Sequence, residues 1–167
     1  MSFGVRYALA FRYALACRLL AQEDSAEPHD KLKHIGHRQT MGERDSKDLT
    51  VLVVEDVEDV RLFMRLELEG FGFIVLEAAD GRSAVDVALQ QHPDVILMDL
   101  TLPVMDGFEA AKLIRKNQEL KDVPIIAVTA HQGTDFRSGA KDSGFDAYVT
   151  KPIDMAWLKE LIDGLLI

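Results

Sequence analysis

The sequence predicts a doubly wound α/β domain, in which helices cover both faces of a five-stranded parallel sheet. From residue 49 onward, short apolar runs typical of strands alternate with longer segments whose apolar residues recur at helical spacing. The run VILM at 95–98 is apolar throughout, which is typical of a strand buried on both faces of a parallel sheet. Because crossovers between parallel strands are right-handed, repeated strand and helix units place their helices on the two faces.

The elements follow one another in a regular order. Strands are expected at residues 49–54, 73–77, 95–98, 125–129 and 145–150. Helical spacing marks the first, second and last helices through three sets of apolar residues: Val57, Val60, Met64 and Leu68; Ala84, Val85, Ala88 and Leu89; and Leu158, Leu161, Ile162 and Leu165. A further helix is expected at about 134–143, although Gly133 and Gly139 interrupt it.

Polar and glycine residues set the ends of these helices. Gly70 and Gly72 end the first helix, and the second begins at Asp80 and ends near His92-Pro93. Asp106 is expected to cap the third helix, which runs to about Asn117, and Asp154 to cap the last.

Charge and cysteine content limit the classes of function. Residues 41–167 hold 13 basic residues against 24 acidic ones, a net charge of −11, whereas residues 1–40 hold 6 against 4, a net charge of +2. Nucleic-acid binding is disfavoured, because it depends on neutralising phosphates with Lys and Arg. Cys17 is the single cysteine and cannot form an internal disulfide, so we expect a reducing, cytoplasmic location.

Residues 1–48 are predicted to be an N-terminal extension and linker, partly helical or disordered. Arginines at positions 6, 12 and 18 divide its apolar stretch into runs too short for a signal peptide or a membrane span. Histidines at 29, 34 and 37 show no recognised metal-ligand spacing. Two alternatives stay open: Met41 is the true start, or the extension is a docking or membrane-surface element.

The residues that follow the predicted strands carry the chemistry. Glu55 and Asp56 follow the first strand, Asp99 the third, Thr129 ends the fourth and Lys151 follows the fifth. Ligands bind at the carboxyl ends of the strands in such sheets. Three nearby acids repel one another unless a cation lies among them, and Mg²⁺ prefers oxygen ligands. With a lysine and a hydroxyl beside them, an Asp can act as a nucleophile and form an aspartyl phosphate.

Four motifs in order resemble the response-regulator receiver family. They are VLVVED at 51–56, LMDLTLPVMDG at 97–107, VTA at 128–130 and YVTKP at 148–152. The resemblance covers residues 49–167 and implies a flavodoxin-like domain with strand order 2-1-3-4-5. It also implies a stand-alone response regulator in a two-component phosphorelay, since nothing resembling an output domain follows the last predicted helix.

The resemblance assigns roles residue by residue. Asp99 would be the phosphoacceptor. Asp56, Asp99 and the backbone carbonyl of Thr101 would bind Mg²⁺ directly, and Glu55 would act through water. Lys151 would contact the phosphoryl group, and its bond to Pro152 would be cis. Thr129 and Tyr148 would change position when Asp99 is phosphorylated. Pro103 and Gly107 would shape the loop after the acceptor. Thr101 and His131 occupy the positions that tune self-dephosphorylation in this family.

The implied partners are other proteins. The phosphodonor would be a histidine kinase or a histidine phosphotransfer protein. The downstream target would bind the face formed by the predicted helix at 134–143, the strand at 145–150 and the last helix. The protein would be a phosphoacceptor and not an enzyme, beyond Mg²⁺-dependent self-phosphorylation from small donors and self-dephosphorylation.

Other classes fit the sequence less well. A dehalogenase-like phosphohydrolase needs D-x-D after its strand, whereas this chain has Asp99-Leu100-Thr101. No glycine-rich G-x-G-x-x-G loop of a Rossmann enzyme follows any strand. A receiver-like interaction module that is never phosphorylated stays the alternative, although such proteins usually lack an acceptor, acidic or lysine position that this chain retains.

Overall fold

A five-stranded parallel sheet forms the centre of the computed structural model. Its strands are β1 (Thr50–Val54), β2 (Ile74–Ala78), β3 (Val95–Asp99), β4 (Ile125–Thr129) and β5 (Ala147–Thr150). They lie in the order β2-β1-β3-β4-β5, and each neighbouring pair is parallel. The predicted fold class and strand order are therefore confirmed.

The structure describes residues 49–130 and 144–166. Four helices fall in these ranges: α2 (Glu58–Gly70), α3 (Gly81–Gln91), α4 (Gly107–Lys116) and α6 (Met155–Leu166). None of them is long and apolar enough to cross a membrane. The expectations for residues 1–48, for His131 and for a helix at 134–143 lie outside the described residues.

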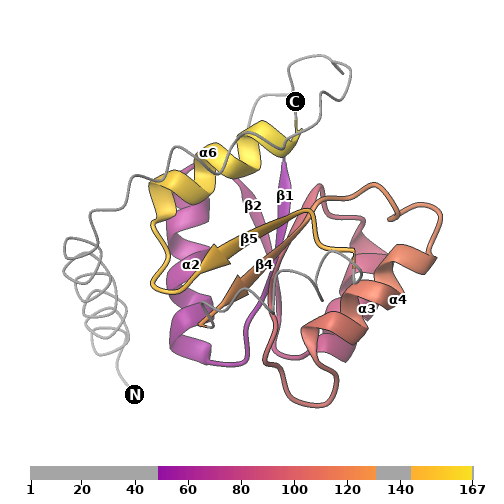
Figure 1. Cartoon of the computed structure of the whole chain (residues 1–167). Helices are drawn as coiled ribbons and strands as arrows, with labels where there is room; N and C mark the ends of the chain where they lie inside the picture. The colour runs from indigo at the N-terminus through magenta and orange to yellow at the C-terminus, as the bar shows by residue number, and fades with distance from the viewer. Residues whose placement is uncertain (1–48, 131–143, 167) are drawn as a thin grey trace.

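Each strand contributes alternate side chains to two hydrophobic cores, because successive residues of a strand point to opposite faces. Val51 and Val53 of β1 join the core that α2 and α6 cover. Leu52 and Val54 join the core that α3 and α4 cover. Figure 1 shows these two pairs of helices on opposite sides of the sheet. The fully apolar run of β3 follows from this arrangement, since both of its faces are buried.

Aspartates begin three of the helices, as the sequence predicted. The side chain of Asp80 accepts a hydrogen bond from the backbone N–H of Ser83, and that of Asp106 accepts one from Glu109. Asp154 accepts hydrogen bonds from the backbone N–H groups of Ala156 and Trp157. Each carboxylate satisfies amides that have no partner within the helix itself.

Two apolar residues of the predicted helices lie on the surface instead of in the core. Val57 is 50% exposed because it precedes α2 at the N-cap position and is not part of the buried helix face. Leu89 is 38% exposed, while its neighbour Ala88 carries the contact with the sheet. The strand ends also shift slightly, and the shortest strand, β5, begins at Ala147.

Two glycines fix the loop that follows Asp99. A Cβ atom on Gly107 would lie 2.3 Å from the carbonyl oxygen of Asp99, and one on Gly81 would lie 2.2 Å from that of Met105. Real Cβ atoms do not approach backbone so closely, so the loop at 100–106 can pack against α3 and α4 only over glycine. The expected role of Gly107 in shaping this loop agrees with this contact, whereas Gly81 was not foreseen.

Replacing Gly107 by alanine is therefore expected to lower the free energy of unfolding by about 1–3 kcal/mol, because the backbone around Asp99 must move to admit the methyl group. Urea unfolding of the full chain measures this change. Gly164→Ala in α6 is the matched control, since no atom lies within 4 Å of its added Cβ. The control should gain up to about 1 kcal/mol from the higher helix propensity of alanine. Equal unfolding midpoints for the two variants would contradict this account.

Candidate functional site

Three carboxylates meet at the carboxyl edge of the sheet. Glu55 and Asp56 follow β1, and Asp99 ends β3, the strand that pairs directly with β1. One oxygen from each of the three side chains lies within 4.8 Å of the others. Asp56 is exposed, whereas Glu55 is 1% and Asp99 7% exposed. The cluster is therefore open to solvent on one side and buried on the other.

Lys151, which follows the edge strand β5, brings a positive charge into this cluster. Its Nζ donates to Oε2 of Glu55 at 2.7 Å and to Oδ2 of Asp99 at 2.5 Å. Its backbone N–H donates to the carbonyl of Thr129 at 2.8 Å, which ties the residue to the end of β4. The Lys151-Pro152 bond is cis, as predicted. An ammonium bonded to two carboxylates offsets part of their mutual repulsion.

Both carboxylate oxygens of Asp99 have a hydrogen-bond donor. The backbone N–H of Thr101 donates to Oδ1 at 2.9 Å, and Lys151 holds Oδ2. The bond from Thr101 comes from the loop that Gly81 and Gly107 support. It therefore fixes the rotation of the Asp99 side chain at the point where the strand ends.

Burial changes the protonation equilibria of the paired groups. Desolvation raises the pKa of Glu55 above its ordinary value of 4.5, although the hydrogen bond from Lys151 works against this shift. Desolvation alone would lower the pKa of Lys151, but its hydrogen bonds to Asp99 and Glu55 outweigh burial and raise that pKa. The lysine thus stays protonated, and burial makes the ionised form of Glu55 less favourable than it is in water.

Thr129 and Tyr148 lie on one face of the sheet near this edge. Tyr148 is opposite Ala127 in the β4–β5 register, and Thr129 is two residues beyond Ala127. Residues two apart on a strand share a face, so the two side chains are diagonal neighbours. Thr129 is buried, and Tyr148 is half-buried with its ring centroid 6.2 Å from that of Phe145. The Tyr148 hydroxyl has no hydrogen-bond partner within residues 49–130 and 144–166, and burial raises its pKa.

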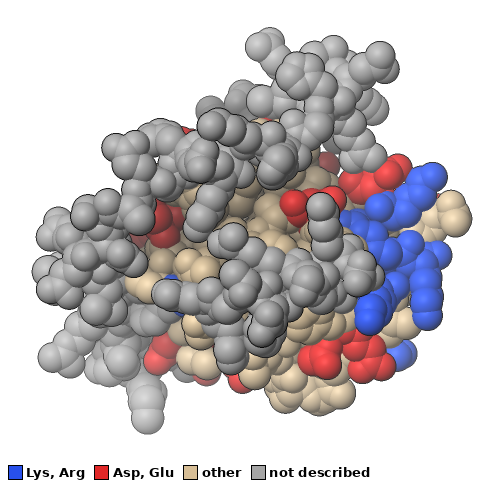
Figure 2. All heavy atoms as spheres, viewed as in Figure 1, with Lys and Arg blue, Asp and Glu red and all other residues tan. Residues whose placement is uncertain are grey.

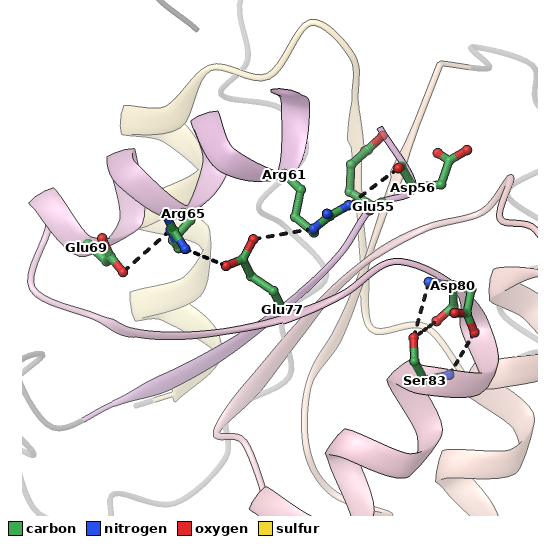
Figure 3. Close-up of polar contacts among 8 residues, drawn as sticks. All are labelled: Glu55, Asp56, Arg61, Arg65, Glu69, Glu77, Asp80 and Ser83. Carbon is green, nitrogen blue, oxygen red and sulfur yellow. Dashed lines mark hydrogen bonds and ion pairs between the residues drawn. The ribbon is translucent and has the colours of Figure 1, made fainter. Parts of the chain in front are cut away.

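The sequence analysis missed Arg61, which lies beside the acidic cluster. Its guanidinium donates to the backbone carbonyl of Glu55 at 2.6 Å and pairs with Glu77 of β2 (Figure 3). The only signal in the sequence was a basic residue close to the start of the predicted helix, where acidic residues are favoured. Such an exception indicates a specific local partner.

The fold and this acidic edge together define the receiver class of two-component signalling proteins. The model of the response regulator receiver domain family matches residues 51–163, and the chain belongs to that family.

Curated relatives and solved structures agree with this assignment. The chain is 36% identical over 118 residues to the polar-differentiation response regulator DivK of Brucella ovis, covering 70% of this chain and 95% of that relative. The chemotaxis response regulator CheY4 of Vibrio cholerae is 31% identical with a TM-score of 0.67, covering 71% of this chain and 98% of CheY4. The receiver domain of the sensor histidine kinase PA1611 of Pseudomonas aeruginosa is 34% identical, with the same TM-score and coverage. That structure carries a magnesium ion coordinated in its active-site cleft.

The raised pKa of Glu55 gives a pH-dependent prediction for the metal-free protein. A carboxyl with a higher pKa in the folded state binds its proton more tightly there, so its contribution to stability is present at low pH and is lost as pH rises through the raised pKa. Glu55→Gln removes this loss. The free energy of unfolding of Glu55→Gln relative to wild type should therefore rise as pH rises above 4.5, and then level off once Glu55 is ionised.

Urea unfolding in the presence of a chelator, over the acid and neutral range, measures this difference. Glu58→Gln is a suitable control, because Glu58 is exposed at the start of α2. A stability difference between Glu55→Gln and wild type that does not change with pH would contradict the prediction.

Proposed function

We propose that this chain is a response regulator in which Mg²⁺-dependent phosphorylation of Asp99 switches binding to a protein partner. The convergence of Asp99, two further carboxylates and Lys151 at one edge of the sheet supports this proposal most directly. Membership of the receiver family supports the reaction type.

The donor atoms around Asp99 fit a magnesium ion. Mg²⁺ prefers hard oxygen ligands and keeps several waters, so one or two carboxylates and a carbonyl suit it. Asp56, Asp99 and the backbone carbonyl of Thr101 would hold the ion, with Glu55 acting through water. When bound, the ion neutralises negative charge that builds up between the carboxylates and the incoming phosphoryl group.

The protein's own groups would orient and receive the phosphoryl group. A carboxylate oxygen of Asp99 attacks the phosphorus, while the bond from phosphorus to the donor's imidazole nitrogen breaks and that nitrogen leaves with the electron pair. The N–H of Thr101 holds the attacking side chain in one rotation. The ammonium group of Lys151, which donates to Asp99 before the reaction, would then donate to a phosphoryl oxygen. The long side chain and the three N–H donors of lysine allow this change of partner.

Thr129 and Tyr148 would carry the signal from the phosphorylated site to a partner. A phosphoryl group adds about 1.5 to 2 negative charges and new acceptor oxygens, which attract the Thr129 hydroxyl. Movement of Thr129 opens space beside Tyr148 on the same face of the sheet. Among the described residues, no hydrogen bond holds the Tyr148 hydroxyl in one position, so phosphorylation can shift an existing equilibrium of this side chain.

The organisation and partners follow from the same proposal. Residues 49–167 form the receiver domain and residues 1–48 an extension and linker. The phosphodonor is a histidine kinase or a histidine phosphotransfer protein in the cytoplasm, and the target binds the face that includes β5 and α6. Figure 2 shows Lys and Arg side chains gathered on the side where α4 lies in Figure 1. Lys112 and Lys116 of α4 are exposed, but the chain's net charge of −9 still disfavours nucleic acid.

Incubation of the full chain with acetyl phosphate and Mg²⁺ should add one phosphoryl group, since a small donor can replace the protein donor. Intact mass spectrometry measures the gain. The same treatment should leave Asp99→Asn unmodified, because an amide cannot act as the nucleophile, and chelation of the metal should abolish the gain in wild type.

A wild type that gains no mass, although it binds Mg²⁺, would overturn phosphorylation as the function and favour the unphosphorylated interaction module. A gain that persists in Asp99→Asn would place the acceptor at another residue.

A further inference from the structure

One side chain donates hydrogen bonds to the backbone of the loop that carries Glu55 and Asp56. Arg61 of α2 donates from Nη1 to the carbonyl of Glu55 at 2.6 Å and to that of Asp56 at 3.4 Å. On the other side of the loop, the N–H of Glu55 donates to the carbonyl of Ala78 at the end of β2. The backbone of the acidic pair is thus held both by the sheet and by Arg61.

Glu77 fixes Arg61 in place. Oε1 of Glu77 lies 3.4 Å from Nε of Arg61, and Oε2 accepts from Nη1 of Arg65 at 2.8 Å. Figure 3 shows this carboxylate of β2 between the two arginines, with Arg61 reaching on toward Glu55 and Asp56. The side chain of Arg61 is 16% exposed and that of Glu77 30%, so this ion pair is partly shielded from solvent and from salt.

Arg61 and Arg65 share Glu77 but differ in one respect. Both lie on α2 one turn apart, and both pair with the same carboxylate. The hydrogen bonds recorded for Arg65 do not reach the backbone of Glu55 or Asp56, whereas Arg61 contacts both carbonyls. Arg65 therefore serves as a natural control for the part of the network that only joins α2 to β2.

We propose that Arg61 is a positioning residue that sets the affinity of the Glu55 and Asp56 loop for divalent cations. The inference rests on the proposed function, in which these residues hold Mg²⁺. A cation near the N-terminus of a helix interacts unfavourably with the helix dipole, so Arg61, the fourth residue of α2, is expected to have a compensating local interaction. The two backbone carbonyls and the carboxylate of Glu77 supply this interaction.

The charge of Arg61 and its hydrogen bonds have opposite effects on the affinity of the loop for a divalent cation. The positive guanidinium disfavours a nearby metal ion, whereas its hydrogen bonds hold the ligand loop in one conformation. The carboxylate of Glu77, which Arg61 shares with Arg65, offsets part of the charge, and we take the ordering of the loop as the larger effect. Lysine keeps the charge but lacks the planar fork that binds carbonyls and a carboxylate together, so Arg61→Lys separates the two effects.

Calorimetric titration of the full chain with MgCl₂ is the first test. Arg61→Lys is expected to weaken Mg²⁺ binding about tenfold, a size typical of groups that orient metal ligands. Arg65→Lys should change the affinity by less than about twofold, because its contacts are partly exposed ion pairs. The initial rate of phosphorylation by acetyl phosphate should fall in Arg61→Lys at limiting Mg²⁺ and recover at saturating Mg²⁺.

Amide hydrogen exchange of the metal-free protein is the second test. Exchange at residues 55–57 should accelerate in Arg61→Lys and stay at the wild-type rate in Arg65→Lys. Equal Mg²⁺ affinity and equal exchange in wild type and Arg61→Lys would overturn the inference. Equal losses in the two lysine variants would also overturn it, because they would assign the effect to the packing of α2 on β2. A wild type that binds no Mg²⁺ would overturn the proposed function and this inference together.

Discussion

Repulsion among three carboxylates is the constraint on which the rest of this structure depends. Glu55, Asp56 and Asp99 lie within 4.8 Å of one another at the edge of the sheet, where two of them are buried. Like charges at this distance raise the free energy of the folded state unless other groups compensate. Lys151 bonds to two of the three and offsets part of this repulsion. Burial nevertheless raises the pKa of Glu55, with a smaller contribution from the charge of Asp99.

The surrounding elements keep these acids from moving apart. Parallel pairing of β1 with β3 fixes the distance between the two strand ends. Gly81 and Gly107 allow the loop after Asp99 to pack tightly, and Arg61 holds the backbone of Glu55 and Asp56. A site that is held rigidly in an unfavourable arrangement is well suited to bind a cation and a phosphoryl group, because little reorganisation is needed.

Much of this arrangement was predictable from local sequence. The alternation of apolar residues located every described strand to within two residues, and the caps at Asp80, Asp106 and Asp154 formed as expected. Val57 and Leu89 belong to the apolar sets at helical spacing but lie at the surface, because a periodic pattern does not show where a helix begins or how far its buried face extends.

The sequence by itself determined which residues meet at the edge, since parallel strands bring their carboxyl ends together and each strand end could be read directly. The strand order came from resemblance to a family and not from periodicity. Only the tertiary structure decided that Lys151 bonds to Glu55 and Asp99, that Gly81 admits the loop, and that Arg61 holds the acidic pair. The hydrogen bonds of Lys151 join residues that are 96 and 52 positions apart in the sequence. Those of Arg61 depend on the orientation of the backbone carbonyls of Glu55 and Asp56. Local sequence does not predict either set of hydrogen bonds, because both form only when separate elements pack against one another.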